Sequence, residues 1–293
     1  MTLAEAALLG LIQGLTEFLP VSSTAHLVAA RELLGHPRTD DAFTTVVQLG
    51  TLVAVVVYFR HDLWALTRGV LGDVVARRAG SSPDARLAWL IVAATVPVVV
   101  VGLTAKKWLK HNFYNLPTMG VVAIVFALLM LAAEVWARRR PADPTEGPAD
   151  PRPITLGQAV QVGLWQALAL MPGASRSGTT ITGGLFAGLT RPVAARFSFL
   201  MSLPSVAGAG VKELYDEYKL FRHPDLDTRP SLFTSADDGL ALAVGLVVSG
   251  VVGYVAIAAL LRFLTRYSLG VFVGYRLLFG GLLIVAALGA FGK

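Results

Sequence analysis

The chain contains no cysteine and little charge. The lack of cysteine excludes disulfide bonds and catalysis by a thiolate. Charged residues make up 15% of the 293 positions, whereas soluble domains carry about 25%. Hydrophobic residues account for 55% of the chain, and the mean hydropathy is +0.64. This composition predicts a polytopic membrane protein rather than a soluble domain.

A basic N-terminal region is also missing. The first basic residue is Arg31, so the hydrophobic N-terminus is not expected to be a cleaved signal peptide. The formal charge of +6 could suggest nucleic-acid binding. However, Lys and Arg lie mostly in short segments between apolar runs, where membrane proteins carry them. They form no stripe with interleaved aromatic residues, and we expect no nucleic-acid partner.

Long apolar stretches dominate the rest of the sequence. A bilayer span needs about 20 mostly apolar residues, and the stretches that qualify are 42–59, 87–105, 116–137, 193–211, 239–262 and 269–290. The segment 60–86 is expected to be a polar loop. Two more apolar runs, 3–35 and 156–190, are each broken by a Pro- and Ser-containing segment. Each predicts a re-entrant helix pair that dips into the membrane and returns, which requires protein or a wet cavity around the break.

A proline-rich linker divides the chain in two. Five of the thirteen residues 141–153 are proline, which is typical of a semi-rigid surface linker, here placed at 141–155. The first repeat is then 1–140 and the second 156–293, each with one re-entrant pair and three spans. Because three is odd, the second repeat starts on the opposite face. The predicted fold class is an all-α polytopic membrane protein of two inverted repeats, with the re-entrant tips meeting near its centre.

The two interrupted runs carry similar polar residues. Residues 10–26 read GLIQGLTEFLPVSSTAH, and residues 163–180 read GLWQALALMPGASRSGTT. Both contain Gly-Leu-x-Gln-x-Leu followed by Pro-x-x-Ser, with one residue fewer between the blocks in the second copy. Paired breaks in hydrophobic segments are the best sequence pointer to a binding site in a membrane protein built from repeats. The site is therefore expected at these two breaks.

Glu17 is the acidic residue of the first break. It follows Gln13 by four residues, so both side chains lie on one helical face. An ionised carboxylate at membrane depth is costly unless it has a partner. Glu17 is therefore either satisfied structurally by a neighbouring helix, or it is a general base or cation ligand with the Gln13 carbonyl oxygen beside it. One acid and one amide suit Mg²⁺, which takes few protein oxygens and binds substrate phosphate.

Ser22, Ser23 and His26 follow at once. Helix capping alone explains either serine, but it does not explain a histidine one turn further along an apolar arm. A lone buried histidine is more often structural than catalytic. The close spacing of acid, hydroxyls and imidazole at a membrane break leaves a catalytic role for His26 as the alternative.

Arg176 is the centre of the second break, PGASRSGTT at 172–180. Arginine binds phosphate through two parallel hydrogen bonds, and the hydroxyls of Ser175, Ser177 and Thr180 together with a helix N-terminus add donors for the same anion. The structural alternative is an interfacial arginine whose head group reaches for water. The residues favour an oxyanion site, for phosphate, within the membrane.

At these segments the chain resembles the undecaprenyl-diphosphatase family of the bacitracin-resistance type. The family pattern is (E/Q)-x-x-x-E, then P-x-S-S with a nearby histidine, and P-G-x-S-R-S-x-x-T. The segments VQLG at 47–50, FSFLMSLP at 197–204 and GYR at 274–276 are similar as well. The resemblance covers nearly the whole chain. It implies a membrane enzyme that removes the terminal phosphate of undecaprenyl diphosphate and recycles this lipid carrier for cell-wall synthesis.

The resemblance also implies properties of the site. It implies a divalent cation, Mg²⁺ or Ca²⁺, on Gln13 and Glu17, an inverted-repeat fold, a homodimer, and a site facing the outer side of the bacterial inner membrane. Gln13 stands where many relatives have Glu, so cation binding rests more heavily on Glu17. The implied catalytic residues are Glu17, Ser23, His26 and Arg176, and the implied substrate-binding residues are Ser22, Gln48, Gly173, Ser175, Arg176, Ser177 and Thr180.

Several alternatives stay open at this stage. The nucleophile is Ser23, His26 or water, with Ser23 favoured and His26 as its acid and base. Inverted repeats with paired breaks are also typical of a transporter or flippase for an anionic lipid or solute. A purely structural membrane protein is disfavoured, because Glu17, His26 and Arg176 would then be costly polar residues with no function. A slight excess of Lys and Arg in the loops of one face predicts both termini outside.

Overall fold

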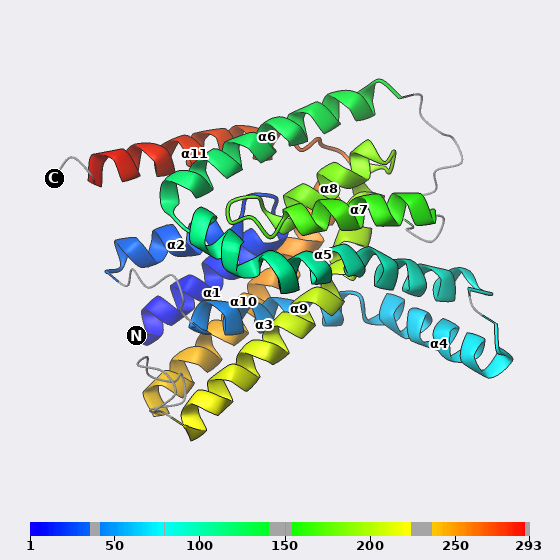
Figure 1. The fold of residues 1–293 in the computed structure, drawn as a ribbon, viewed down its shortest axis with the longest axis horizontal. Coiled ribbons are helices and arrows are strands. Elements are labelled where there is room, and N and C mark those ends of the chain that lie inside the picture. Colours follow the sequence, from blue (N-terminus) through cyan, green and yellow to red (C-terminus); the bar gives the residue numbers. More distant parts are fainter. Residues whose placement is uncertain (36–41, 79, 141–149, 151–153, 224–235, 291–293) are drawn as a thin grey trace.

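The computed structural model describes residues 1–35, 42–78, 80–140, 150, 154–223 and 236–290, and within these its regular elements are helices (Figure 1). The prediction of an all-α membrane protein is confirmed. The helices are α1 (Leu3–Phe18), α2 (Ser23–Leu33), α3 (Ala42–Tyr58), α4 (Arg60–Ala76), α5 (Pro83–Phe113), α6 (Leu116–Arg138), α7 (Leu156–Leu168), α8 (Arg176–Phe186), α9 (Arg191–Arg222), α10 (Ala236–Leu264) and α11 (Gly270–Ala290).

Four helices in the described part of the chain are long and apolar enough to cross a membrane. They are α5 over Pro83–Ala105, α6 over Leu116–Arg138, α10 over Asp238–Leu264 and α11 over Gly270–Gly289. The pair α3 and α4 meets the same criterion together but bends by 74° at their junction. The expected span 193–211 lies inside α9, a more polar helix because it carries Arg196 and several serines. The chain is therefore a multi-pass membrane protein.

The expectation of a polar loop at 60–86 is wrong over most of its length, because α4 occupies Arg60–Ala76. Its polar residues are spaced among leucines and valines, which a helix accommodates. Asp73 then ties down the turn to α5 by accepting hydrogen bonds from the Gly80 N–H at 2.5 Å and the Ser81 N–H at 3.2 Å. Most of the expected linker 141–155 lies outside the described residues.

The two helix pairs that were expected to be re-entrant, α1 with α2 and α7 with α8, start and break alike. α1 begins with a capping box formed by Thr2, and α7 begins with one formed by Thr155. The second arms begin after Ser22 and Ser175, which both adopt left-handed backbone, with φ of 78° and 69°. Thr2 and Thr155 are 153 positions apart in the sequence, as are Ser22 and Ser175, and Gln13 and Gln166.

An alignment of the two halves at this offset needs no gap. It matches Ser175 with Ser22 and not with Ser23.

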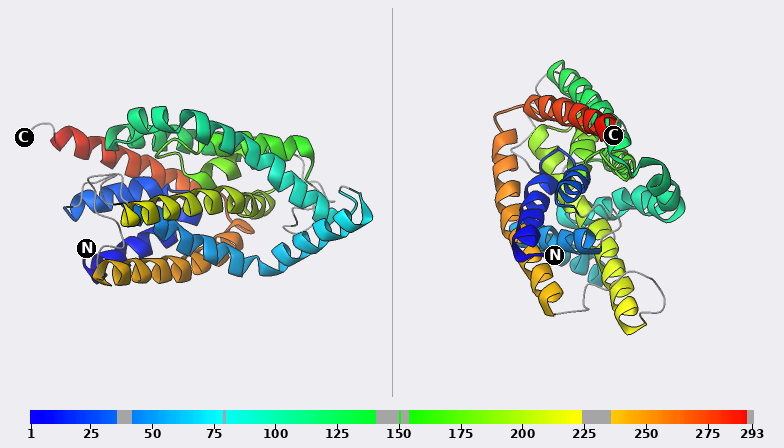
Figure 2. Two further views of the ribbon diagram at one scale, coloured as in Figure 1. Left: turned by 60° about the horizontal axis from the view of Figure 1, so that its bottom comes forward. Right: turned by 90° about the vertical axis from the view of Figure 1, so that its left-hand side faces the viewer.

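Matched glycines bring each first arm against a neighbouring helix. A Cβ atom on Gly10 would overlap the Gly245 carbonyl of α10, and one on Gly163 would overlap the Ala94 carbonyl of α5. Gly10 therefore forms a close small-residue contact with α10. α6 packs along α11 and α3 packs along α9. The free ends of α1 and α11 lie at the same end of the molecule (Figure 1 and the left panel of Figure 2). The two breaks are thus held in the middle of the helical assembly.

Candidate active site

Glu17 and Arg176 meet at the centre of the fold although they come from different halves of the chain. Glu17 lies in the last turn of α1, and Arg176 is the first residue of α8. Arg176 Nη2 donates a hydrogen bond of 2.5 Å to Glu17 Oε1. Only 4% of the Glu17 side chain is exposed, so its charge depends on this partner. The structure therefore brings the two expected site residues together.

The second carboxylate oxygen of Glu17 accepts hydrogen bonds from two further side chains. Glu17 Oε2 accepts hydrogen bonds from Gln13 Nε2 at 3.0 Å and from Ser23 Oγ at 2.7 Å. Gln13 is placed by the helical i, i+4 spacing, whereas Ser23 is brought back to Glu17 by the left-handed turn at Ser22. One carboxylate thus joins an amide, a hydroxyl and a guanidinium. A nucleophile and its base are expected at this separation.

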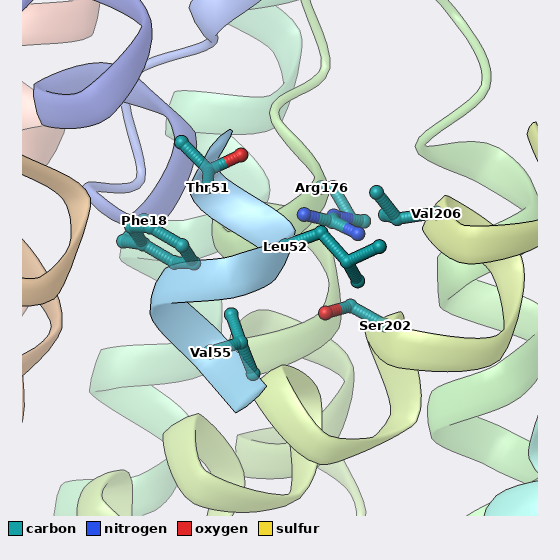
Figure 3. A pocket seen from close by; sticks show the side chains of 7 residues that line it. All are labelled: Phe18, Thr51, Leu52, Val55, Arg176, Ser202 and Val206. Carbon is teal, nitrogen blue, oxygen red and sulfur yellow. The ribbon is translucent and has the colours of Figure 1, made fainter. Parts of the chain in front are cut away.

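Arg176 also lines a narrow pocket between α1, α3, α8 and α9 (Figure 3). Its Nη1 atom is buried and has no hydrogen-bond partner among the described residues. The other lining residues are Phe18, Thr51, Leu52, Val55, Ser202 and Val206. The expected residue Gln48 lies one turn before Thr51 and Leu52 on α3. A donor without a partner at the wall of a pocket is suited to an anionic ligand.

The hydroxyl groups next to Arg176 stabilise the turn at the start of α8 by hydrogen bonds to the backbone. Ser175 Oγ accepts a hydrogen bond of 3.2 Å from the Gly178 N–H. Ser177 Oγ donates to the Leu19 carbonyl at 3.1 Å, and Thr180 Oγ1 donates to the Arg176 carbonyl at 2.7 Å. Ser177 and Thr180 are almost fully buried. In the structure these side chains fix the start of α8, which aims Arg176 at Glu17.

Arg276 on α11 contacts both helix breaks, the one between α1 and α2 and the one between α7 and α8. It is completely buried, and its Nη1 and Nη2 atoms donate to the Pro20 carbonyl at 3.4 Å and the Gly173 carbonyl at 3.0 Å. Pro20 and Gly173 are again 153 residues apart. The sequence reading assigned no role to Arg276. The sequence feature that could have identified it is a charged residue inside an apolar stretch, where such residues are rare and usually functional.

His26 lies beside Ser22 and α11 rather than against Ser23. Its Nδ1 atom is 2.7 Å from the Ser22 carbonyl oxygen, and its Nε2 atom is 2.6 Å from the Tyr275 hydroxyl. The imidazole stacks on Phe279 with ring centroids 3.9 Å apart. The expected pairing of Ser23 with His26 as its base is not seen. Glu17 occupies that position instead.

A row of serines on α9 faces α7 and α8, and no role for these serines was expected from the sequence. Ser198 Oγ is 2.5 Å from Thr180 Oγ1, Ser202 lines the pocket beside Arg176 (Figure 3), and Ser205 Oγ accepts a 3.0 Å hydrogen bond from Gln166 Nε2. The spacing of four and three residues puts them on one helical face. That spacing within FSFLMSLPS at 197–205 was the signal available in the sequence.

Comparison with known proteins places the chain in a family. A family model described as bacitracin resistance protein BacA matches residues 6–282. The chain belongs to the BacA family. Undecaprenyl-diphosphatase from Myxococcus xanthus (strain DK1622) is 45% identical over 287 residues, which cover 97% of this chain and 89% of the relative. The undecaprenyl-diphosphatase of Chloroherpeton thalassium is 44% identical over 284 residues, covering 97% and 96%. That of Chlorobium phaeobacteroides (strain BS1) is 43% identical over 280 residues, covering 96% and 95%.

The first break of this BacA-family chain has the donors for a divalent cation. Gln13 Oε1 is buried and has no hydrogen-bond partner among the described residues, and it belongs to the side chain that contacts Glu17. An amide oxygen and a carboxylate, completed by phosphate oxygens and water, match the hard ligands of Mg²⁺ and Ca²⁺. The described residues contain no cluster of three His, Asp or Glu side chains. A cation here would therefore depend on substrate oxygens as well.

Proposed function

We propose that the protein is an integral membrane phosphatase that hydrolyses undecaprenyl diphosphate to undecaprenyl phosphate and inorganic phosphate. This reaction recycles the lipid carrier for cell-wall synthesis. The observation that carries the proposal is the contact of Arg176 and Ser23 with the same buried carboxylate, Glu17, across the two repeats. It joins an anion-binding group, a nucleophile and a base. The relatives named undecaprenyl-diphosphatase supply the substrate class.

Arg176 binds the diphosphate in this proposal. The diphosphate competes with Glu17 for the guanidinium, and Arg176 Nη1 has no hydrogen-bond partner in the described part of the chain. A bound phosphoryl group therefore gains a bidentate contact and releases Glu17 from its ion pair. The N-terminal N–H groups of α8 add to the positive field, which stabilises the charge that develops in the transition state. Ser22, Gln48, Gly173, Ser175, Ser177 and Thr180 complete or support this binding surface.

Ser23 is the nucleophile that the geometry favours. Its oxygen attacks the terminal phosphorus, the bond from phosphorus to the bridging oxygen breaks, and undecaprenyl phosphate leaves with that oxygen. The Ser23 proton passes to Glu17, to which it is already hydrogen-bonded at 2.7 Å. Water then cleaves the serine phosphate, releases inorganic phosphate and restores the Ser23 hydroxyl. In the alternative, His26 or Glu17 activates water directly and no phosphoserine forms.

Gln13 and Glu17 would hold a divalent cation, Mg²⁺ or Ca²⁺. When bound, it supplies positive charge close to the diphosphate oxygens. The buried Gln13 Oε1 atom, for which the described segments provide no hydrogen-bond partner, supports this assignment.

Removal of divalent cations should suppress phosphate release. We expect the purified enzyme in excess chelator to lose at least about 90% of its activity, because one carboxylate and one arginine then face the whole charge of the diphosphate. Adding back Mg²⁺ or Ca²⁺ should restore the rate, whereas Na⁺ at equal ionic strength should not. Full turnover in excess chelator would exclude the cation role of Gln13 and Glu17.

The arrangement in the membrane is also proposed. The repeated capping boxes, the left-handed serines and the paired helix contacts support two inverted repeats of common ancestry. We place the protein in the bacterial inner membrane with both termini and the opening of the site on the outer side. The slight excess of Lys and Arg in the loops of the other face supports this orientation. We further propose a homodimer, which is tested by molecular mass in detergent.

One experiment tests the activity and the order of its steps. Purified protein in detergent is given undecaprenyl diphosphate labelled in its terminal phosphate. We expect release of labelled inorganic phosphate and, after rapid acid quenching, label on Ser23. A transporter or flippase would release none, because transport requires a sealed bilayer. Release without any labelled protein would favour direct attack by water.

A further inference from the structure

Tyr275 of α11 contacts His26 of α2 although 249 residues separate them. We propose that Tyr275 is a positioning residue that acts through His26 on the Ser22 turn and so aims Ser23 at Glu17. The contact is specific, because the Tyr275 hydroxyl is 2.6 Å from His26 Nε2 and the two rings are nearly parallel, at 11°. The effect on turnover rests on the proposed phosphatase function, whereas the positioning itself does not.

The hydrogen bonds around His26 fix which nitrogen carries the proton. A carbonyl oxygen only accepts, so Nδ1, at 2.7 Å from the Ser22 carbonyl oxygen, must carry hydrogen. In the neutral ring Nε2 then has a free lone pair and accepts the proton of the Tyr275 hydroxyl. Tyr275 thereby holds His26 in the Nδ1–H tautomer, the form that can bind Ser22. Without that hydroxyl the ring is free to adopt the other tautomer, which cannot donate to Ser22.

The Ser22 turn needs this support more than its counterpart does. Both Ser22 and Ser175 have left-handed backbone, which residues other than glycine seldom adopt. The Ser175 side chain stabilises its own turn by accepting the Gly178 N–H. Within the described start of α2, the Ser22 side chain forms no such cap. At the break between α1 and α2, the His26 imidazole stabilises the turn by its hydrogen bond to the Ser22 carbonyl oxygen. The next residue, Ser23, is thereby placed to reach Glu17.

α11 is anchored so that Tyr275 keeps its place. The adjacent Arg276 binds carbonyl oxygens in both re-entrant tips. Phe279, one turn further on, lies against the His26 ring with centroids 3.9 Å apart and planes at 10°. The ring is thus oriented by two aromatic side chains and one hydroxyl from the same helix. A hydrogen-bonded path runs from Tyr275 through His26 to the Ser22 carbonyl.

The kinetic test removes only the hydroxyl. Tyr275→Phe keeps the stacked ring, and we expect kcat to fall by about 10- to 100-fold, as for a small misplacement of a reacting group, with KM within about twofold. In the His26→Gln background the same substitution should change kcat by less than about twofold, because its effect passes through His26. Tyr254→Phe, at a similarly exposed tyrosine on α10 that packs on Tyr58, is the control and should keep wild-type turnover.

A second measurement reads the tautomer without using activity. In ¹⁵N-histidine-labelled protein, the ring whose signals disappear in His26→Gln is assigned to His26. We expect the Nδ1–H pattern in wild type and a mixture of tautomers in Tyr275→Phe. Equal kinetic losses from Tyr275→Phe in both backgrounds, or an unchanged His26 tautomer, would overturn the proposal. If wild type releases no phosphate, the proposed function fails, and the ring spectrum still decides the role of Tyr275.

Discussion

Replacing Arg176 with alanine should lower kcat/KM for undecaprenyl diphosphate at least about 1,000-fold, which corresponds to about 4 kcal/mol of transition-state stabilisation. The guanidinium is the group that neutralises the phosphoryl oxygens, and its removal also leaves Glu17 buried without its 2.5 Å ion-pair partner. Arg176→Lys should recover only part of the activity, because a lysine provides a point charge and not a planar pair of donors. Phosphate release in detergent measures both variants.

Arg196 offers a matched control for that experiment. It is a partly buried arginine of similar exposure, 28% against 20% for Arg176. It also pairs with a carboxylate, since Arg196 Nη2 is 3.0 Å from Asp62 Oδ1, but no phosphate-binding role is assigned to it. We expect Arg196→Ala to keep turnover within about threefold of wild type. Loss of a partly exposed ion pair mainly lowers the stability of the fold. Similar losses in both variants, or near-normal activity of Arg176→Ala in a folded protein, would remove Arg176 from the site.

Glu17→Gln should also reduce kcat at least about 1,000-fold. The amide has nearly the shape of the carboxylate and can still accept a hydrogen bond from Ser23, so the fold should persist. It cannot take the Ser23 proton, and it is a weaker ligand for a divalent cation. Single-turnover phosphate release measures the loss, and thermal unfolding in detergent checks the fold. Raised Mg²⁺ should not rescue this variant, because the missing base is not replaced by cation.

The control for Glu17 is the carboxylate of the other ion pair. Asp62→Asn changes an acid that contacts Arg196 at 3.0 and 3.1 Å, and it should leave turnover within about threefold. More than one tenth of wild-type activity in Glu17→Gln would contradict the assignment of Glu17 as base. The two controls together compare two arginine–carboxylate pairs in one protein, of which only one is assigned to the chemistry.

The centre of the site was predictable from the sequence because its chemistry is rare in apolar surroundings. Glu17 and Arg176 interrupt hydrophobic runs at matched breaks, and a shared site lets each charge find its partner. The helical fold followed from the same hydrophobic lengths. By contrast, α4 was missed because its charged residues resemble those of a loop when their neighbours are unknown. Its contact with α9 through Asp62 and Arg196 appears only in three dimensions.

The partners within the site could not be read in the same way. Which base faces Ser23 depends on the left-handed turn at Ser22, and that backbone conformation leaves no mark in a serine-rich sequence. The match of Pro20-x-x-Ser23 with Pro172-x-x-Ser175 suggested an alignment of the two halves with a one-residue gap. The starts of α2 and α8 instead align Ser22 with Ser175 without a gap. Arg276 and Tyr275 are polar residues in an apolar span, but their contacts with Gly173 and His26, more than 100 residues away, required coordinates.

The internal ion pair of Arg176 with Glu17 has a consequence for selectivity. A free phosphate or sulfate ion must displace a carboxylate that is already in place, and it offers few other contacts in return. A lipid diphosphate brings a second phosphoryl group and a long hydrocarbon chain, whose burial among the helices contributes to opening the pair. The resting protein therefore discriminates against small oxyanions, among them the inorganic phosphate that the proposed reaction releases.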